Sequence, residues 1–269
     1  MLIDSHCHIV DSDKKVWTLF DSLKYKYCVM SAVLSDFDKV SSLASLYRSK
    51  VIPAFGIHPW KISHIVTDCK VYFGKCDDFS HALVLIEHEL EKYLLQHPES
   101  MVGEIGLDQY AKNPETGLIH DFSNQQALFE MQFRLAVRLN RPVSVHCVKC
   151  QGWLLEFLMK QKQVPKIMMH SYGGSREMIK QLTRIPMAGD KIFFSFSSIV
   201  NSRKSDVAKV IKAVPINRLL IESDVSNIEV VDEELEKTLK MICDSLQVND
   251  ILKQIEENQK AFFIDQNMQ

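Results

Sequence analysis

Histidine and carboxylate side chains recur just after short apolar runs of this chain, where β-strands are expected to end. Six potential metal ligands stand at such places: His6, His8, Glu104, His146, His170 and Asp224. Imidazole nitrogen and carboxylate oxygen are the groups that hold divalent cations in proteins. Side chains two residues apart on a strand point to the same side, so His6 and His8 would project together. The joint pattern predicts a metal site.

The number of candidate ligands favours two ions over one. A catalytic zinc takes three protein ligands and keeps one position open, and six ligands exceed that number. They suit two ions that share a carboxylate, and Glu104 from the fourth strand is the natural bridge. Two ions ~3.5–4 Å apart can activate a water and neutralise the charge of a phosphate. Asp224 would bind an ion and also take a proton from the attacking water. We expect two divalent ions as cofactors, Mg²⁺, Mn²⁺ or Zn²⁺.

Three further residues are candidate substrate contacts. His58, in Gly-Ile-His-Pro at the end of the third strand, would contact a phosphate, orient a ligand or cap a turn. Ser171 opens the loop Ser-Tyr-Gly-Gly-Ser, whose amides could hold a phosphate; a simple helix cap by Ser175 is the alternative. Lys149 would add positive charge near His146, or be a solvated lysine.

Short strands alternate with amphipathic helices along the chain. The strands are rich in Val, Ile and Met and nearly continuous in hydrophobicity, as parallel strands buried on both faces require. They are expected at 2–6, 27–34, 51–57, 101–107, 143–147, 166–170, 191–197 and 218–223. Helical patterns cover 37–48, 81–96, 125–139, 206–214, 233–246 and 251–263.

Eight strands with helices between them predict a single (β/α)8 barrel over residues 1–269. An open doubly wound sheet is the alternative. It would leave the first and last strand ends too far apart for their side chains to share a site, whereas a barrel gathers all strand ends around one mouth. The polar segments 61–80 and 111–124 are expected to be irregular loops at this mouth.

Composition limits the possible partners and location. The chain has 269 residues, 46% hydrophobic and 25% charged, with a net charge of −2. Any attraction to nucleic acid must therefore be local. Seven cysteines without a framework predict reduced thiols, and the Cys147–Cys150 spacing is attributed to chance more than to a zinc or redox pair. No secretory signal is visible, nor any apolar run long enough to cross a bilayer. We expect a cytoplasmic or nuclear protein without a membrane partner.

Six motifs together resemble the TatD family of metal-dependent hydrolases. They are Asp-Ser-His-Cys-His at 4–8, Gly-Ile-His-Pro at 56–59, Gly-Glu-Ile-Gly-Leu-Asp at 103–108, Pro-Val-Ser-Val-His at 142–146, His-Ser-Tyr-Gly-Gly-Ser at 170–175 and Glu-Ser-Asp at 222–224. The late Asn258 and Phe262-Phe263 resemble the closing helix of the family. The chain departs from the family at Val148, Ser223 and Val225, where Arg, Thr and Pro are usual.

The resemblance implies a barrel with a two-metal site and a DNase activity, often exonucleolytic on single-stranded DNA. It implies that His6, His8, Glu104 and Asp224 hold one ion and that Glu104, His146 and His170 hold the other. A metal-dependent phosphodiesterase acting on DNA is the leading hypothesis. Hydrolysis of a small amide or ester is the second, although Glu104 stands where amidohydrolases often carry a carbamylated Lys. The third is a catalytically weak relative that binds a protein partner.

Overall fold

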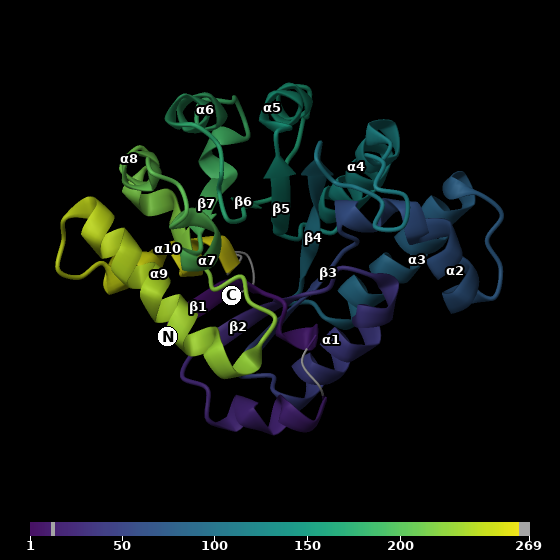
Figure 1. The fold of residues 1–269 in the computed structure, drawn as a ribbon, viewed down its shortest axis with the longest axis horizontal. Coiled ribbons are helices and arrows are strands. Elements are labelled where there is room, and N and C mark those ends of the chain that lie inside the picture. The colour runs from purple at the N-terminus through teal and green to yellow at the C-terminus, as the bar shows by residue number, and fades with distance from the viewer. Residues whose placement is uncertain (12–13, 264–269) are drawn as a thin grey trace.

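Eight parallel strands form one sheet that follows the order of the chain, with helices arranged around it (Figure 1). The computed structural model describes residues 1–11 and 14–263. The strands are β1 (Ile3–Cys7), β2 (Lys26–Met30), β3 (Val51–Phe55), β4 (Met101–Asp108), β5 (Val143–Val148), β6 (Ile167–Met169), β7 (Ile192–Phe196) and β8 (Leu219–Ile221). Each strand pairs in parallel with the next, from β1 with β2 to β7 with β8.

The first and last strands meet at the end of the sheet where the strands finish. The Asp224 N–H donates to the His6 carbonyl at 3.1 Å, and the His8 N–H donates to the Val225 carbonyl at 2.8 Å. The Asp4 carboxylate accepts a hydrogen bond from the Ser223 N–H at 2.9 Å. These bonds close the sheet into a barrel at its mouth. The expected (β/α)8 barrel is confirmed, and the open-sheet alternative is wrong.

Helix α10 (Leu252–Phe263) seals the opposite end of the same seam. The Gln259 side chain accepts from the Ile3 N–H at 2.9 Å and donates to the Ile3 carbonyl. Asn258 donates to the Leu219 carbonyl at 2.8 Å, so two neighbouring helix residues contact β1 and the start of β8. The ring centroid of Phe262 lies 5.3 Å from that of Phe193, and this contact closes the bottom of the barrel. The closing helix expected at 251–263 is therefore present.

The barrel wall separates two apolar layers. The inner layer is small and rich in Met and Phe: Cys28, Met30, Ile52, Ala54, Met101, Met168, Phe193, Leu220 and Phe262. The outer layer lies between the strands and the helices and contains most other buried apolar residues, among them Val29, Phe55 and Val145. Strands β3, β6 and β8 are apolar toward both layers, so period-two alternation is absent from their sequences.

Most expected helices appear within a few residues of their predicted bounds. The helices are α1 (Leu34–Leu46), α2 (Ile65–Phe73), α3 (Phe79–Gln96), α4 (Phe122–Arg138), α5 (Gln151–Met159), α6 (Arg176–Leu182), α7 (Ser198–Asn201), α8 (Val207–Ile211) and α9 (Val231–Leu246), besides α10. Short 3₁₀ segments are η1 (Ile9–Asp11), η2 (Lys14–Asp21), η3 (Pro59–His64), η4 (Gly189–Lys191), η5 (Ile216–Arg218) and η6 (Ile228–Val230).

Two predictions about local structure are wrong. The strand expected at 27–34 ends at Met30, because Asp36 accepts hydrogen bonds from the Ala32 and Val33 N–H groups and starts α1 there. The segment 61–80, expected to be irregular, contains part of η3 and all of α2. Helix α2 carries several β-branched residues, which have low intrinsic helix propensity, and buries only Ile65 and Cys69. The segment 111–124 is irregular up to α4, as expected.

The expected domain over 1–269 includes residues 12–13 and 264–269, which lie outside the described residues. Within 1–11 and 14–263, no helix combines the length and the apolar character needed to cross a bilayer.

Candidate active site

The six predicted ligands converge at the mouth of the barrel. His6 lies in β1, Glu104 in β4 and His146 in β5, while His8, His170 and Asp224 come just after β1, β6 and β8. Glu104 and His6 are buried, whereas the Asp224 side chain is 14% exposed to solvent. The mouth therefore combines a buried centre with a rim that solvent reaches.

Glu104 lies between two groups of imidazoles, one for each carboxylate oxygen. Its Oε2 is 3.1 Å from His8 Nε2 and 3.4 Å from His6 Nε2. Its Oε1 is 3.1 Å from both His146 Nδ1 and His170 Nε2. Asp224 Oδ1 lies 3.9 Å from the Nε2 atoms of His6 and His8. The arrangement places a single carboxylate between two half-sites.

The geometry fits divalent cations. Ligand atoms about 2.1 Å from a common ion and about 90–110° apart lie roughly 3.0–3.4 Å from each other. The four separations between Glu104 and the imidazole nitrogens, 3.1 Å to 3.4 Å, match that spacing. Glu104 Oε1 is also buried without a hydrogen bond from the described residues. Buried carboxylate oxygens normally have such a partner, so this atom is available to an ion.

Electrostatics keep the bridging carboxylate charged. Burial raises the pKa of Glu104, but the electrostatic effect of the surrounding imidazoles of His58, His170 and His6 outweighs burial and holds that pKa well below its ordinary value. Burial lowers the pKa of His170, yet Glu104, Glu222 and Asp224 raise it well above the usual value. Carboxylate and imidazole groups, the two kinds of ligand that divalent cations take in proteins, are thus packed together.

A buried carboxylate, Glu222, supports His170 from behind. Its Oε1 lies 3.0 Å from His170 Nδ1 and accepts hydrogen bonds of 2.7 Å from both the N–H and the hydroxyl of Ser171. Burial raises the pKa of Glu222, but His170 outweighs it and brings the value to about 2. With Nδ1 facing this charged oxygen, His170 presents Nε2 to the centre.

A second carboxylate, Asp108, supports His146 in the same way. Its Oδ2 lies 3.3 Å from His146 Nε2 and accepts a 2.6 Å hydrogen bond from the Trp60 indole. Burial raises the pKa of Asp108, but the bonds to His146 and Trp60 lower it to about 2. Ser144 Oγ, 2.8 Å from Nδ1, supports His6. Sequence reasoning did not assign roles to Glu222 and Asp108, although both stand within its motifs.

His58 combines two of the roles considered for it. Its Nδ1 accepts the Trp60 N–H at 3.1 Å, which caps η3, and its Nε2 lies 3.2 Å from Glu104 Oε1. Burial lowers the pKa of His58 to about 4. A neutral imidazole at this position serves both as turn cap and as neighbour of the bridging carboxylate.

Ser171 is held inside the protein. Its hydroxyl, which has a single proton to donate, lies 2.7 Å from Glu222 Oε1, 3.1 Å from Asp224 Oδ2 and 2.7 Å from Ser197 Oγ. Its amide is therefore engaged by Glu222 instead of facing the mouth. Ser175 accepts the Met178 N–H at 3.2 Å and caps α6, the simpler of the two roles considered for this loop.

Lys149 follows β5 at the mouth and has a neighbour that sequence reasoning missed. Lys204 donates to the Gly173 carbonyl at 2.5 Å. Burial lowers the pKa of Lys204, Asp206 raises it, and the charge of Lys149 lowers it further. The sequence feature that could have indicated Lys204 is the basic pair Arg203-Lys204, which follows the seventh strand.

Strained backbone accompanies three of the predicted residues. Lys149, Ser171 and Asp224 have φ values of 58°, 37° and 57°. Positive φ is uncommon outside glycine and costs on the order of 1–3 kcal/mol, and such residues cluster at functional sites. All three closely follow strands of the barrel, where the chain must turn sharply to aim a side chain at the mouth.

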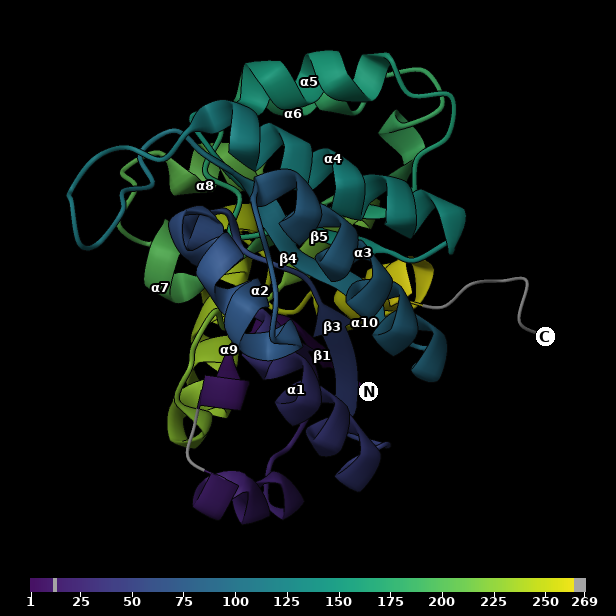
Figure 2. The same cartoon turned by 90° about the vertical axis from the view of Figure 1, so that its right-hand side faces the viewer.

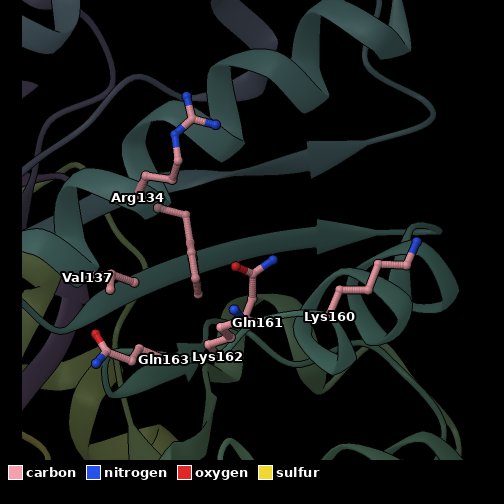
Figure 3. Close-up of a pocket in the computed structure, with 7 residues that line it drawn as sticks. Arg134, Val137, Lys160, Gln161, Lys162 and Gln163 are labelled. Carbon is pink, nitrogen blue, oxygen red and sulfur yellow. The ribbon is translucent and has the colours of Figure 1, made fainter.

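The cysteines and a pocket are distinct from the candidate ligands. All seven cysteines are free thiols, including Cys147 and Cys150. A shallow pocket of about 600 Å³ is lined by Arg134, Val137 and residues 160–163 (Figure 3). These residues end α4 and lead into β6, so the pocket lies at the end of the barrel where strands begin, opposite the candidate site.

Comparisons with known proteins agree with this geometry. The family model described as TatD related DNase matches residues 3–264. The Cut9-interacting protein scn1 of Schizosaccharomyces pombe is 30% identical over 97% of this chain and 98% of its own length. An uncharacterized deoxyribonuclease of Saccharomyces cerevisiae is 30% identical over 83% of both chains.

Among solved structures, the TatD homolog YjjV of Escherichia coli superposes with a TM-score of 0.72 over 97% of each chain, at 22% identity. This likeness shows the fold, and the family model covers nearly the whole sequence. The chain therefore belongs to the TatD-related DNase family.

Proposed function

We propose that this metal-dependent hydrolase is a phosphodiesterase that cleaves single-stranded DNA with two divalent ions, in the manner of a 3′–5′ exonuclease. The observation that carries the proposal is the placement of Glu104, whose two oxygens face two separate sets of imidazoles. In this site His6, His8, Glu104 and Asp224 would hold one ion, and Glu104, His146 and His170 the other. Mg²⁺, Mn²⁺ and Zn²⁺ all accept such nitrogen and oxygen ligands.

Bound ions would neutralise phosphate oxygens and lower the pKa of an attacking water. The protein supplies the rest of the chemistry. Asp224, the most exposed of the carboxylates at the centre, takes the proton of the attacking water. Its Oδ2 lies 3.1 Å from the Ser171 hydroxyl, and its Oδ1 faces His6 and His8.

Placement of the site supports a single-stranded substrate. The bridging carboxylate is buried inside the barrel mouth, so a phosphodiester must enter the mouth to reach it. A flexible strand end would enter such a mouth more readily than a duplex, because it can bend without breaking base pairs. The net charge of the chain is −2, so attraction to phosphates must be local; Lys149 and Lys204 supply positive charge at the mouth and would contact backbone phosphates.

The test uses protein stripped with EDTA and reloaded with Mn²⁺ or Mg²⁺. A labelled single-stranded DNA should shorten from its 3′ end, and EDTA should stop the reaction. Asp224→Asn should lower kcat by about 100-fold or more while the thermal unfolding temperature stays within a few degrees. Asp190→Asn removes an exposed carboxylate at the other end of the barrel and is the matched control.

The same preparation separates the alternatives. Cleavage of small amides or esters with intact DNA would replace the proposal by amide or ester hydrolysis. The name of the S. pombe relative refers to an interaction with another protein, which keeps a protein-binding role open as a second candidate. A chain that binds no metal, and whose unfolding temperature does not rise when metal is added, would favour that role, because a ligand of the native state stabilises it.

A further inference from the structure

Two exposed aromatic side chains stand beside the candidate metal site. The chain contains 14 Phe, 7 Tyr and 3 Trp. Of those within the described residues, Trp60 and Tyr110 alone are exposed, by 53% and 62%. Trp60 follows β3 and Tyr110 follows β4, which are neighbours in the barrel. Both exposed aromatics therefore lie at the mouth, and none lies on the remaining described surface.

The ring of Trp60 is fixed in place although half of it is exposed. Its indole N–H donates to Asp108 Oδ2 at 2.6 Å. Its centroid lies 5.0 Å from that of His58 and 5.8 Å from that of His146, with both pairs near perpendicular. His120 Nε2 lies 3.2 Å from the Trp60 carbonyl oxygen and ties the loop before α4 to it. A rigid exposed ring next to a reaction centre loses little entropy when a flat ligand covers it.

One buried carboxylate organises both aromatic residues. Asp108 is 4% exposed; its Oδ2 holds the Trp60 indole, and its Oδ1 accepts the Tyr110 N–H at 2.8 Å. The loop that follows Tyr110 projects beyond the strands at the mouth end, opposite α10 (Figure 2). Asp108 also contacts His146, so the aromatic pair and the candidate ligand share a single anchor.

We propose that Trp60, assisted by Tyr110, is a stacking platform for the nucleobase adjacent to the scissile phosphate. The inference rests on the proposed function and adds the group that recognises the base. Stacking on an aromatic side chain tolerates every base, because each base has a π-face, and contributes roughly 5- to 150-fold in affinity. The platform lies after β3 and β4, and the lysines Lys149 and Lys204 lie after β5 and β7. Bases and phosphates of one strand would thus meet different sectors of the rim.

A purely structural role for Trp60 predicts a different result. If the indole served only to hold Asp108, the N–H would matter and the ring face would not. Trp60→Phe keeps an aromatic face and removes the N–H, whereas Trp60→Ala removes both. The two variants therefore separate stacking from support of Asp108 and His146.

The experiment pairs these variants with a change in the base. Two single strands of twelve nucleotides are used, one with thymine and one with 5,6-dihydrothymine, which keeps the hydrogen-bonding groups but loses the flat aromatic ring. Steady-state kcat and KM are measured with Mn²⁺-loaded protein. Phosphorothioate versions that resist cleavage give Kd by fluorescence anisotropy. Leu95→Ala, which removes an exposed apolar side chain on α3, is the control.

The wild type should bind the dihydrothymine strand about 5- to 150-fold more weakly than the thymine strand. Trp60→Ala should weaken binding of the thymine strand by a similar factor and abolish the difference between strands. Trp60→Phe should retain most of the preference. Tyr110→Ala should reduce it in part.

Two outcomes would overturn the platform. In one, Trp60→Ala discriminates between the strands as the wild type does. In the other, Trp60→Phe and Trp60→Ala lose metal and kcat equally, which assigns Trp60 to support of Asp108. If the wild type cleaves DNA normally, either of these outcomes refutes the platform but not the proposed function. A wild type that neither cleaves nor binds any strand with metal present refutes the proposed function, and the platform with it.

Discussion

The carboxylate of Glu222 behind His170 gives a sharp test of how the site is built. Glu222→Gln keeps the volume of the side chain and one carbonyl oxygen, but removes the negative charge. Because that charge faces His170 Nδ1 at 3.0 Å, its loss should weaken the binding of an ion by His170 Nε2. We expect metal affinity to fall in the half-site of His146 and His170, with little change in the other.

The magnitude follows from three contacts. Glu222 Oε1 faces His170 Nδ1 at 3.0 Å and the Ser171 N–H and hydroxyl at 2.7 Å each. Hydrogen bonds to a charged group contribute about 1.5–3 kcal/mol, against about 0.5–1.5 kcal/mol for neutral ones. Loss of a supporting partner of this kind costs about 10- to 100-fold in metal affinity, or roughly 1.4–2.7 kcal/mol.

The assay is a calorimetric titration of stripped protein with Mn²⁺ or Zn²⁺, fitted with two classes of site. Glu222→Gln should weaken one class by about 10- to 100-fold and shift the other by less than about threefold. Glu99→Gln, an exposed carboxylate before β4 at the other end of the barrel, makes the same chemical change far from the site. It should leave both classes unchanged.

Equal affinities in Glu222→Gln and in the wild type would refute the reasoning, provided that the variant folds with the same circular dichroism spectrum. Equal weakening of both classes would also contradict it, since Glu222 contacts His170 directly and is linked by hydrogen bonds to Asp224 of the other half-site only through Ser171. Either result would mean that the charge behind His170 does not determine how the histidine binds metal.

Three further predictions follow from the same structure. Metal binding at neutral pH should release protons, because burial lowers but neighbouring carboxylates raise the pKa values of His8, His146 and His170 above their ordinary value, and protonated imidazole cannot coordinate. Affinity should therefore fall as the pH falls through these raised values; titration enthalpies that do not depend on the ionisation enthalpy of the buffer would contradict this. Gly106→Ala should destabilise the chain by at least about 1–3 kcal/mol and lower its metal content, because a Cβ there would overlap the His146 carbonyl oxygen. An unchanged urea midpoint would show that β5 shifts freely. Gln259→Ala should cost roughly 2–4 kcal/mol in urea unfolding, because it leaves the N–H and carbonyl of Ile3 without their partner at the seam of the barrel. A negligible loss of stability would mean that water replaces the side chain.

Sequence patterns predicted the strands well, because burial on both faces requires a continuous apolar run. Strands of a parallel barrel are apolar toward the inner and outer layers alike, so their continuous apolar runs could be recognised without neighbours. Helix α2 gave no such signal, because its β-branched residues disfavour helix and only Ile65 and Cys69 are buried. Tertiary packing on α3 overrides that weak preference.

The candidate ligands could be located from the chain because the barrel topology brings every strand end to one mouth. Their supporting residues could not. Glu222 stands two residues before Asp224, yet it points behind His170, 52 residues away in sequence. Asp108 reaches His146 and Trp60, which are 38 and 48 residues distant. No local pattern encodes such contacts.

By itself, therefore, the sequence determined the number and order of strands and which imidazoles and carboxylates stand at their ends, since both follow from short-range apolar runs. Only the tertiary structure decided that the two oxygens of Glu104 face different histidines, that Glu222 and Asp108 orient them, and that Trp60 and Tyr110 remain exposed beside them. Those features depend on distances between side chains from different strands, which exist only once the barrel has closed.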